Sequence, residues 1–240
     1  MMKRVLVLVA GSILSFASVV SVASFAAPAE EFGESRKCGI AVDLIQQIQS
    51  HLPTIVQLNN GAVLNPSREW SAIVDREGRL CSAIKVGDAQ PYARAIAIAK
   101  AGTANGFSSD AFAASTANLY AGAQPGGIIF GYNTTNPFNP KYLEEGTGVG
   151  HVVGGVVTSG GGVALYSNGK VIGGLGLAGD TACADHVMAY RMRRAAGLDR
   201  IPGGLGYRGT DNIDYADPDQ TPTGFKHPHC FPMDIPPGDI

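Results

Sequence analysis

The sequence contains little charge, and its basic residues form no run. Asp, Glu, Lys and Arg make up 16% of the 240 residues, and 18 Lys and Arg stand against 20 Asp and Glu. Proteins that bind nucleic acid usually carry a clear excess of Lys and Arg, which neutralises phosphates. The composition therefore argues against a nucleic-acid partner. A hydrolase motif is also missing, because Val157 stands where a nucleophile elbow around Ser159 would need glycine.

Long apolar runs are missing beyond the first 26 residues, where none approaches the roughly 20 residues of a membrane-spanning helix. The one long apolar stretch, residues 5–25, follows Lys3 and Arg4, contains five serines and ends in Ser24-Phe25-Ala26. This layout is typical of a secretory signal peptide. We expect cleavage after Ala26, a periplasmic or secreted mature protein, and no stable membrane insertion after cleavage.

Cysteine is scarce, but its number is even. The four cysteines are Cys38, Cys81, Cys183 and Cys230. In an oxidising compartment they predict two disulfides, with three possible pairings. We favour Cys38–Cys81 with Cys183–Cys230, because each bond would pin a terminal extension to the central domain. The alternative is a zinc site built from Cys183, His186, His229 and Cys230.

Apolar periodicity and turn residues predict alternating helices and strands. Helices are expected over residues 40–48, 92–105, 110–120 and 181–196. Strands are expected over residues 70–75, 80–86, 163–166 and 171–177. Asn168-Gly169 between the last two strands predicts a tight hairpin, because both turn residues need positive φ. Residues 124–150, rich in Pro, Gly and Asn, predict a long inserted loop, and residues 201–240 an extended tail on the domain surface.

Two sequence patterns resemble ligand-binding motifs, but we interpret both as structural features without a ligand. Residues 174–179 match G-x-G-x-x-G, but Asp180 would place a carboxylate where a pyrophosphate should sit. We interpret these glycines as positions where the missing side chain lets a helix pack closely against a strand. Four aspartates lack the glycine turn and final Glu of a calcium loop, and we expect them on a solvated face. They are Asp211, Asp214, Asp217 and Asp219. Trp70 and Tyr92 are expected in the core.

Several segments together resemble one family. They are Ile73-Val74-Asp75, Ala99-Lys100-Ala101, residues 160–165, residues 168–176 and Gly179 with Asp185. Through them residues 65–198 are similar to the GlcG/HbpS family of heme-binding and heme-degrading domain proteins, and residues 180–186 resemble an exported subgroup. The resemblance implies an α/β (α+β) domain over residues 27–200, with an antiparallel sheet of about five strands and helices packed on it. It also implies homo-oligomers, and heme as the ligand of several members.

The expected helix 181–196 carries the most informative polar pattern. Cys183, His186, Tyr190 and Arg193 fall on one face, opposite an apolar stripe that should meet the sheet. His and Tyr can ligate heme iron, and Arg suits a propionate. His151, in a glycine-rich run, is a second candidate ligand. The alternative is that this face is solvated, or that His186 is hydrogen-bonded to the tail for structural reasons.

Two classes of function follow from these residues. The first is an exported protein that binds heme or another small molecule, with an accessory or sensing role. The second is an enzyme of oxidative heme degradation, or one acting on a small carboxylic acid. No preorganised acid/base pair is visible in the sequence, so catalytic residues remain unassigned.

Overall fold

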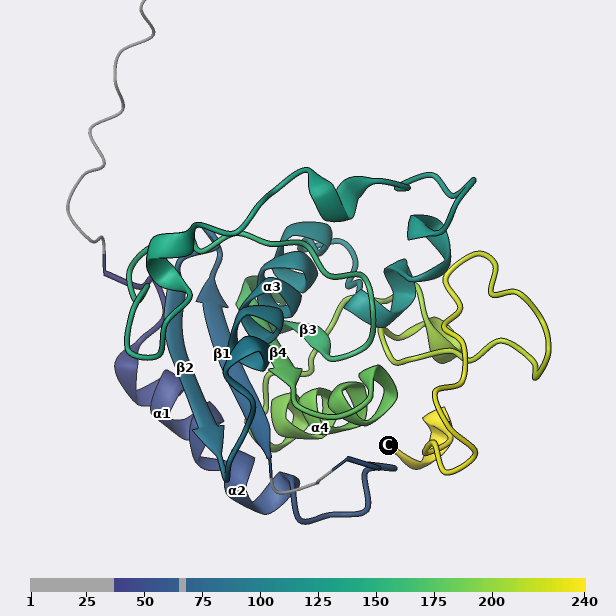
Figure 1. The fold of residues 1–240 in the computed structure, drawn as a ribbon, viewed down its shortest axis with the longest axis horizontal. Helices are drawn as coiled ribbons and strands as arrows, with labels where there is room; N and C mark the ends of the chain where they lie inside the picture. Colours follow the sequence, from purple (N-terminus) through teal and green to yellow (C-terminus); the bar gives the residue numbers. More distant parts are fainter. Residues whose placement is uncertain (1–36, 65–67) are drawn as a thin grey trace, which may run out of the picture. The chain divides into compact units, whose positions relative to one another are not determined.

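The computed structural model describes residues 37–64 and 68–240, and the expected signal peptide lies outside them (Figure 1). The helices are α1 Val42–Ser50, α2 Leu52–Ile55, α3 Pro91–Phe107 and α4 Ala182–Ala195. The strands are β1 Glu69–Asp75, β2 Leu80–Val86, β3 Gly162–Ser167 and β4 Lys170–Ala178. None of these helices has both the length and the apolar character needed to cross a membrane.

The strands form one antiparallel sheet in the order β2-β1-β4-β3. Within the described residues the sheet has four strands, one fewer than the sequence led us to expect. Beyond the edge of β2 the chain makes only isolated bridges, Arg79 with Val152 and Leu80 with Val149. Gly148 and Gly150 have positive φ there, which interrupts extended backbone and prevents a fifth strand.

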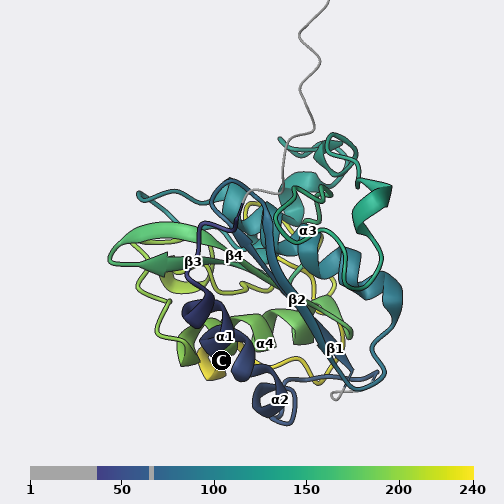
Figure 2. The same ribbon diagram turned by 90° about the vertical axis from the view of Figure 1, so that its left-hand side faces the viewer.

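The helix α3 covers one face of the sheet at very short range (Figure 2). A Cβ on Gly176 would lie 2.0 Å from the carbonyl oxygen of Ala97, and one on Gly174 would lie 2.1 Å from that of Ala101. Only glycine on β4 and alanine on α3 permit this approach. The interpretation of close helix–strand packing is therefore confirmed for Gly174 and Gly176, whereas a Cβ on Gly179 would meet the carbonyl oxygen of Arg68 at 2.2 Å.

The helices α1, α2 and α4 lie on the other face of the sheet, where the main apolar core forms (Figure 2). Leu175 and Leu177 point from β4 into this core, where Val187, Met188 and Met192 of α4 are fully buried. These are the apolar positions that helical spacing assigned to the sheet side of α4.

Two local expectations are wrong. Residues 110–120 do not form one helix; the chain has only the short 3-10 turns Thr116–Leu119 and Ala121–Ala123 there. The hydroxyl of Ser109 accepts the backbone N–H groups of residues 111 and 112, and such side-chain bonds compete with helix formation. Tyr92 is 67% exposed rather than buried, whereas Trp70 is in the core as expected.

The insertion 124–150 contains turns and short 3-10 segments, and a buried arginine anchors it to α3. The guanidinium of Arg94 donates to the carbonyl oxygens of Tyr142 (2.9 Å) and Leu143 (3.2 Å). Arg94 is 2% exposed, so these bonds satisfy a cation inside the protein. The anchor places the following glycine-rich segment beside the C-terminal half of α3, where a cleft forms.

Candidate functional site

The polar stripe of α4 lies beneath the C-terminal tail. His186 is fully buried, and its Nε2 lies 3.0 Å from the backbone nitrogen of Ile213 and 3.1 Å from the side-chain oxygen of Asn212. Arg193 is also fully buried and makes a bidentate ion pair with Asp211. Its Nη1 and Nη2 donate to the two carboxylate oxygens at 2.5 and 2.7 Å. Asp211 is therefore not on a solvated face, which corrects our expectation for that aspartate.

Tyr190 completes this stripe, with its ring 5.8 Å from the His186 ring and 4.8 Å from the Arg193 guanidinium. Burial lowers the pKa of His186 to about 3, so the imidazole is neutral at physiological pH. The structure brings His186, Tyr190 and Arg193 together, and the first and last of them bind the C-terminal tail through Asn212 and Asp211. Their role as heme ligands stays a prediction.

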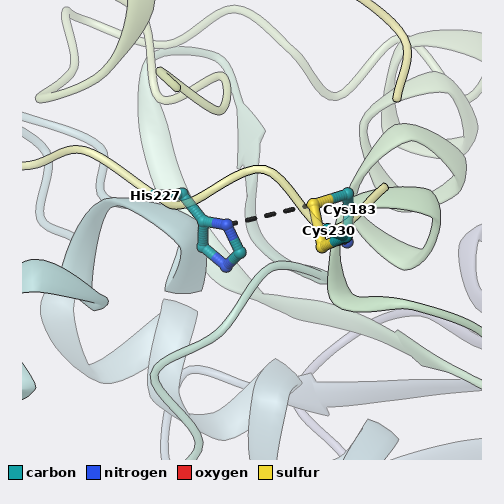
Figure 3. Close-up of side chains that lie close together, drawn as sticks. All are labelled: Cys183, His227 and Cys230. Carbon is teal, nitrogen blue, oxygen red and sulfur yellow. Dashed lines mark hydrogen bonds between the residues drawn. A yellow bond between two sulfur atoms is a disulfide. The ribbon is translucent and has the colours of Figure 1, made fainter. Parts of the chain in front are cut away.

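The structure contains the two favoured disulfides, Cys38–Cys81 and Cys183–Cys230. Figure 3 shows His227 beside the second one, with its Nδ1 3.9 Å from the Cys183 sulfur. Because both sulfurs are used in the disulfide, this cluster offers no thiolate to a metal ion. The imidazole is also engaged, since Nδ1 lies 2.7 Å from the carbonyl oxygen of Pro228 and Nε2 accepts the N–H of Gly160 at 3.3 Å.

His151 lies in the glycine-rich segment outside β2. Its ring stacks on Tyr142, with the ring centroids 4.4 Å apart, and its carbonyl oxygen accepts the N–H of Leu80 at 2.9 Å. The stacking and the backbone bond fix this residue against the sheet edge. Its neighbour Val152 reaches the cleft described next, whereas His151 does not line it.

A cleft of about 360 Å³, which we call the α3 cleft, lies beside the C-terminal half of α3. Its floor is the C-terminal half of α3, and its other walls are the β1–β2 turn and residues 152–156. Gly102 and Gly106 stand one helical turn apart, and a Cβ on either would meet no atom within 4 Å. The absence of side chains at these two positions therefore leaves one face of α3 bare and creates the cleft.

The walls of the α3 cleft are mainly apolar, and its mouth carries the guanidinium of Arg76 and the carboxylate of Glu77. Apolar side chains come from Val74, Ile98, Phe107, Val152 and Val156. Arg76 is exposed at the mouth, and it donates to the carbonyl and side-chain oxygens of Asn105 and to the carbonyl oxygen of Ser108 (3.1 Å). These bonds fix a positive charge beside the C-terminus of α3, where it can also meet a carboxylate.

A buried charged cluster lies where β1, α3 and α4 meet. The ammonium of Lys100 donates to Asp185 at 2.6 Å and to the carbonyl oxygen of Leu177 at 3.1 Å. Glu69 is fully buried, and neither of its carboxyl oxygens has a hydrogen-bond partner of good geometry. Burial, together with the nearby charge of Asp185, raises the pKa of Glu69 well above its usual value. Burial likewise raises the pKa of Asp185 to about 6, although Lys100 opposes this shift.

A second cavity, of about 210 Å³, opens onto this cluster. Lys100 and Asp185 form part of its lining, together with Tyr92, Ile96 and Ser159. A carboxyl with a pKa near 6 beside an ammonium can exchange protons with a ligand near neutral pH. The structure thus places a carboxyl of raised pKa at this cavity, which the sequence did not reveal.

The region that holds both cavities matches a known family. The family described as "Haem degrading protein HbpS-like" matches residues 69–193, which are 125 of the 240 residues. The chain belongs to the HbpS-like family. This confirms the resemblance to GlcG/HbpS proteins drawn from Lys100, Asp185 and the glycine-rich hairpin. No curated protein matches the chain.

Several solved structures are similar to this chain. PduOC, crystallised as a heme complex, is 25% identical and aligns over 65% of this chain and 94% of its own, with a TM-score of 0.49. The Klebsiella pneumoniae protein ORFY is 19% identical over 66% of this chain and 90% of its own, with a TM-score of 0.49. HbpS is 18% identical over 70% and 92%, with a TM-score of 0.45.

Heme is the group that the HbpS-like description implies. The α3 cleft suits the porphyrin ring of heme but not its iron. Its apolar walls and bare glycine floor suit a flat ring system, and Arg76 suits a carboxylate. Proteins hold heme iron with His, Cys, Met or Tyr, and none of these is among the described residues that line the cleft. The residues present therefore fit a porphyrin but supply no iron ligand.

Sequence reasoning missed the residues that form both cavities. The helix expected over residues 92–105 stops before Gly106, and the i,i+4 spacing of Gly102 and Gly106 was the signal of a bare helical face. No local signal marks Glu69 or Arg76 as part of a site. Their neighbours come from distant parts of the chain, so only the folded structure assembles them.

Proposed function

We propose that this protein binds heme, or a planar carboxylate-bearing molecule of the same class, in the α3 cleft. The observation that carries the proposal is the bare face of α3 at Gly102 and Gly106, opposite apolar walls and beside Arg76. The volume of about 360 Å³ falls within the range of small-molecule pockets. Membership of the HbpS-like family supports heme as the class of ligand.

Binding in this cleft should depend on the ring system and its carboxylates more than on iron. We expect hemin and iron-free protoporphyrin IX to bind with dissociation constants within about threefold of each other, because no cleft residue ligates iron. Absorbance titration measures the first and fluorescence titration the second. Esterifying the two carboxylates should weaken binding, because an ester cannot pair with the guanidinium of Arg76.

Gly102 provides the decisive pair of variants. Gly102→Leu places a large side chain in the cleft and should weaken binding of both porphyrins by about tenfold or more, a loss of about 1.4 kcal/mol or more. Gly102→Ala leaves most of the cleft open and should keep binding, while stabilising α3 by up to about 1 kcal/mol. If hemin binds far more tightly than the iron-free ring, and His186→Ala abolishes that preference, the iron site is the α4 stripe instead.

Export is part of the proposal, and the signal-like first 26 residues support it. The two disulfides suit an oxidising compartment. Expression with the whole leader, followed by N-terminal sequencing of the mature protein, should give Ala27 as the first residue. A protein that retains Met1 and stays with the cytoplasmic fraction would contradict export.

Proton transfer on a small carboxylic acid is a second candidate function, and the cavity beside Lys100 and Asp185 favours it. The pKa of about 6 for Asp185 suits a group that takes and returns a proton near neutral pH. Exchange of the methyl protons of pyruvate for deuterium, followed by NMR, tests this candidate. Wild-type protein should accelerate exchange and Asp185→Asn should not; equal rates for both would remove the candidate.

A further inference from the structure

A third pocket lies between the end of α3, the 3-10 turns that follow it, the insertion and the tail. Its volume is about 170 Å³. Its principal side chains are Phe107, Phe112, Leu119, Ile128, Leu205 and Phe225. Phe107 is the one lining residue that it shares with the α3 cleft, so the two are separate cavities.

This apolar pocket offers nothing to a charged or hydrogen-bonding ligand. Asn118 is the one polar side chain among the described residues that line it. Its amide oxygen accepts the N–H of Ser115 at 3.0 Å, and its amide nitrogen donates to the carbonyl oxygen of Asn212 at 3.1 Å. With both ends of that amide engaged, the lining side chains offer no free hydrogen-bonding group to water inside the pocket.

The mouth of the pocket exposes apolar side chains to solvent. Ile128 is 91% exposed, Phe225 43% and Phe112 41%. A cluster of exposed apolar groups around an apolar pocket marks a binding site more often than an ordinary surface. The side chains come from the insertion, the tail and the segment after α3, which all meet at this point.

We propose that this pocket binds a single uncharged apolar ring, of the size of benzene or toluene. The volume sets the size of the ligand, because an apolar cavity of about 150 Å³ holds one benzene ring, and this pocket is of that size although it is open at its mouth. The ring can be a small aromatic molecule or the uncharged aromatic end of a larger one. The lining contains no titratable side chain, so affinity is independent of pH and insensitive to salt.

Toluene is the probe, and benzoate is the charged control of nearly the same shape. Saturation-transfer NMR and calorimetry on the purified, disulfide-intact protein should show that toluene binds and that benzoate binds about tenfold or more weakly, the cost of placing a carboxylate where no partner exists. Toluene should also raise the melting temperature, because it binds the folded chain only.

Ala114 and Ala111 provide a matched pair of variants. Ala114 is fully buried and lines the pocket, whereas Ala111 is exposed three residues earlier. Ala114→Leu should fill the pocket and weaken toluene binding by about tenfold or more, with the same substitution at Ala111 leaving it unchanged. Ile128→Ser, at a side chain that is 91% exposed, should weaken toluene binding while leaving the melting temperature of the free protein unchanged.

Three results would overturn the proposal. Toluene fails to bind wild-type protein, or it binds Ala114→Leu as tightly as wild type when that variant is folded by circular dichroism. The third is a dimer in sedimentation that toluene does not disturb and Ile128→Ser dissociates, which would assign the patch to a second copy of the chain. None of these readouts involves porphyrin, so they do not depend on the function proposed for the α3 cleft.

Discussion

Replacing Lys100 with methionine tests the buried charged cluster directly. The substitution removes the ammonium that neutralises Asp185 and keeps most of the side-chain volume. The two charged groups are 2.6 Å apart, and each side chain is only 3% exposed. Removing one partner of such a pair costs about 3–5 kcal/mol, because a buried charge is left without compensation. We expect this loss in the free energy of unfolding at mildly alkaline pH.

The same substitution should cost much less in mild acid. Burial raises the pKa of Asp185 to about 6 and that of Glu69 well above its usual value. A carboxyl with a raised folded-state pKa contributes stability below its unfolded pKa, near 4, and this contribution is lost as the pH rises through the folded pKa. Without Lys100 the folded-state pKa of Asp185 rises further. At about pH 5 the Asp185 carboxyl of the variant is therefore protonated, and no unpaired charge is left buried.

Urea unfolding followed by circular dichroism measures both effects, at about pH 8 and about pH 5, with the disulfides intact. Lys85→Met is the matched control, because Lys85 pairs with Glu145 on the surface, with side chains 37% and 62% exposed. An exposed pair contributes about 1 kcal/mol or less at either pH. Equal losses for Lys100→Met at both pH values, or a loss no larger than that of Lys85→Met, would refute the reasoning.

The tail gives three further predictions, each measured by urea or thermal unfolding. Burial lowers the pKa of His186 to about 3, so its contribution is present above the unfolded pKa near 6.5 and is lost as the pH falls. His186→Gln should therefore lose less stability than wild type between pH 7 and pH 4; an equal loss would contradict this. Replacing both Cys183 and Cys230 with serine should cost about 4 kcal/mol, because that disulfide closes a loop of 47 residues. Arg193→Met should cost about 3–5 kcal/mol by leaving Asp211 buried and unpaired, and Asp211→Leu in the same chain should restore most of it.

The sequence by itself determined most local elements of this protein, although the helix expected over residues 110–120 does not form. Asn168 and Gly169 have φ of 53° and 75°, as the predicted hairpin turn requires. The start of α4 lies one residue later than expected, because Thr181 rather than Asp180 caps the helix by accepting the N–H of Ala184 at 3.1 Å. These features depend on a few consecutive residues, and the local backbone preferences of those residues are enough to fix them. The glycines of β4 also predicted close packing, because a missing Cβ permits contact whatever the partner is.

Only the tertiary structure decided what covers each face and where space remains. Helical spacing placed His186 and Arg193 on one side of α4, but periodicity cannot say that Asp211 and Asn212 of the tail would bury them. The charged cluster likewise needs Glu69, from a strand more than thirty residues before Lys100 in sequence, to meet α3 and α4. A bare helical face becomes a cleft only when other segments wall it without filling it. Those contacts join residues far apart in the chain, and no local preference specifies them.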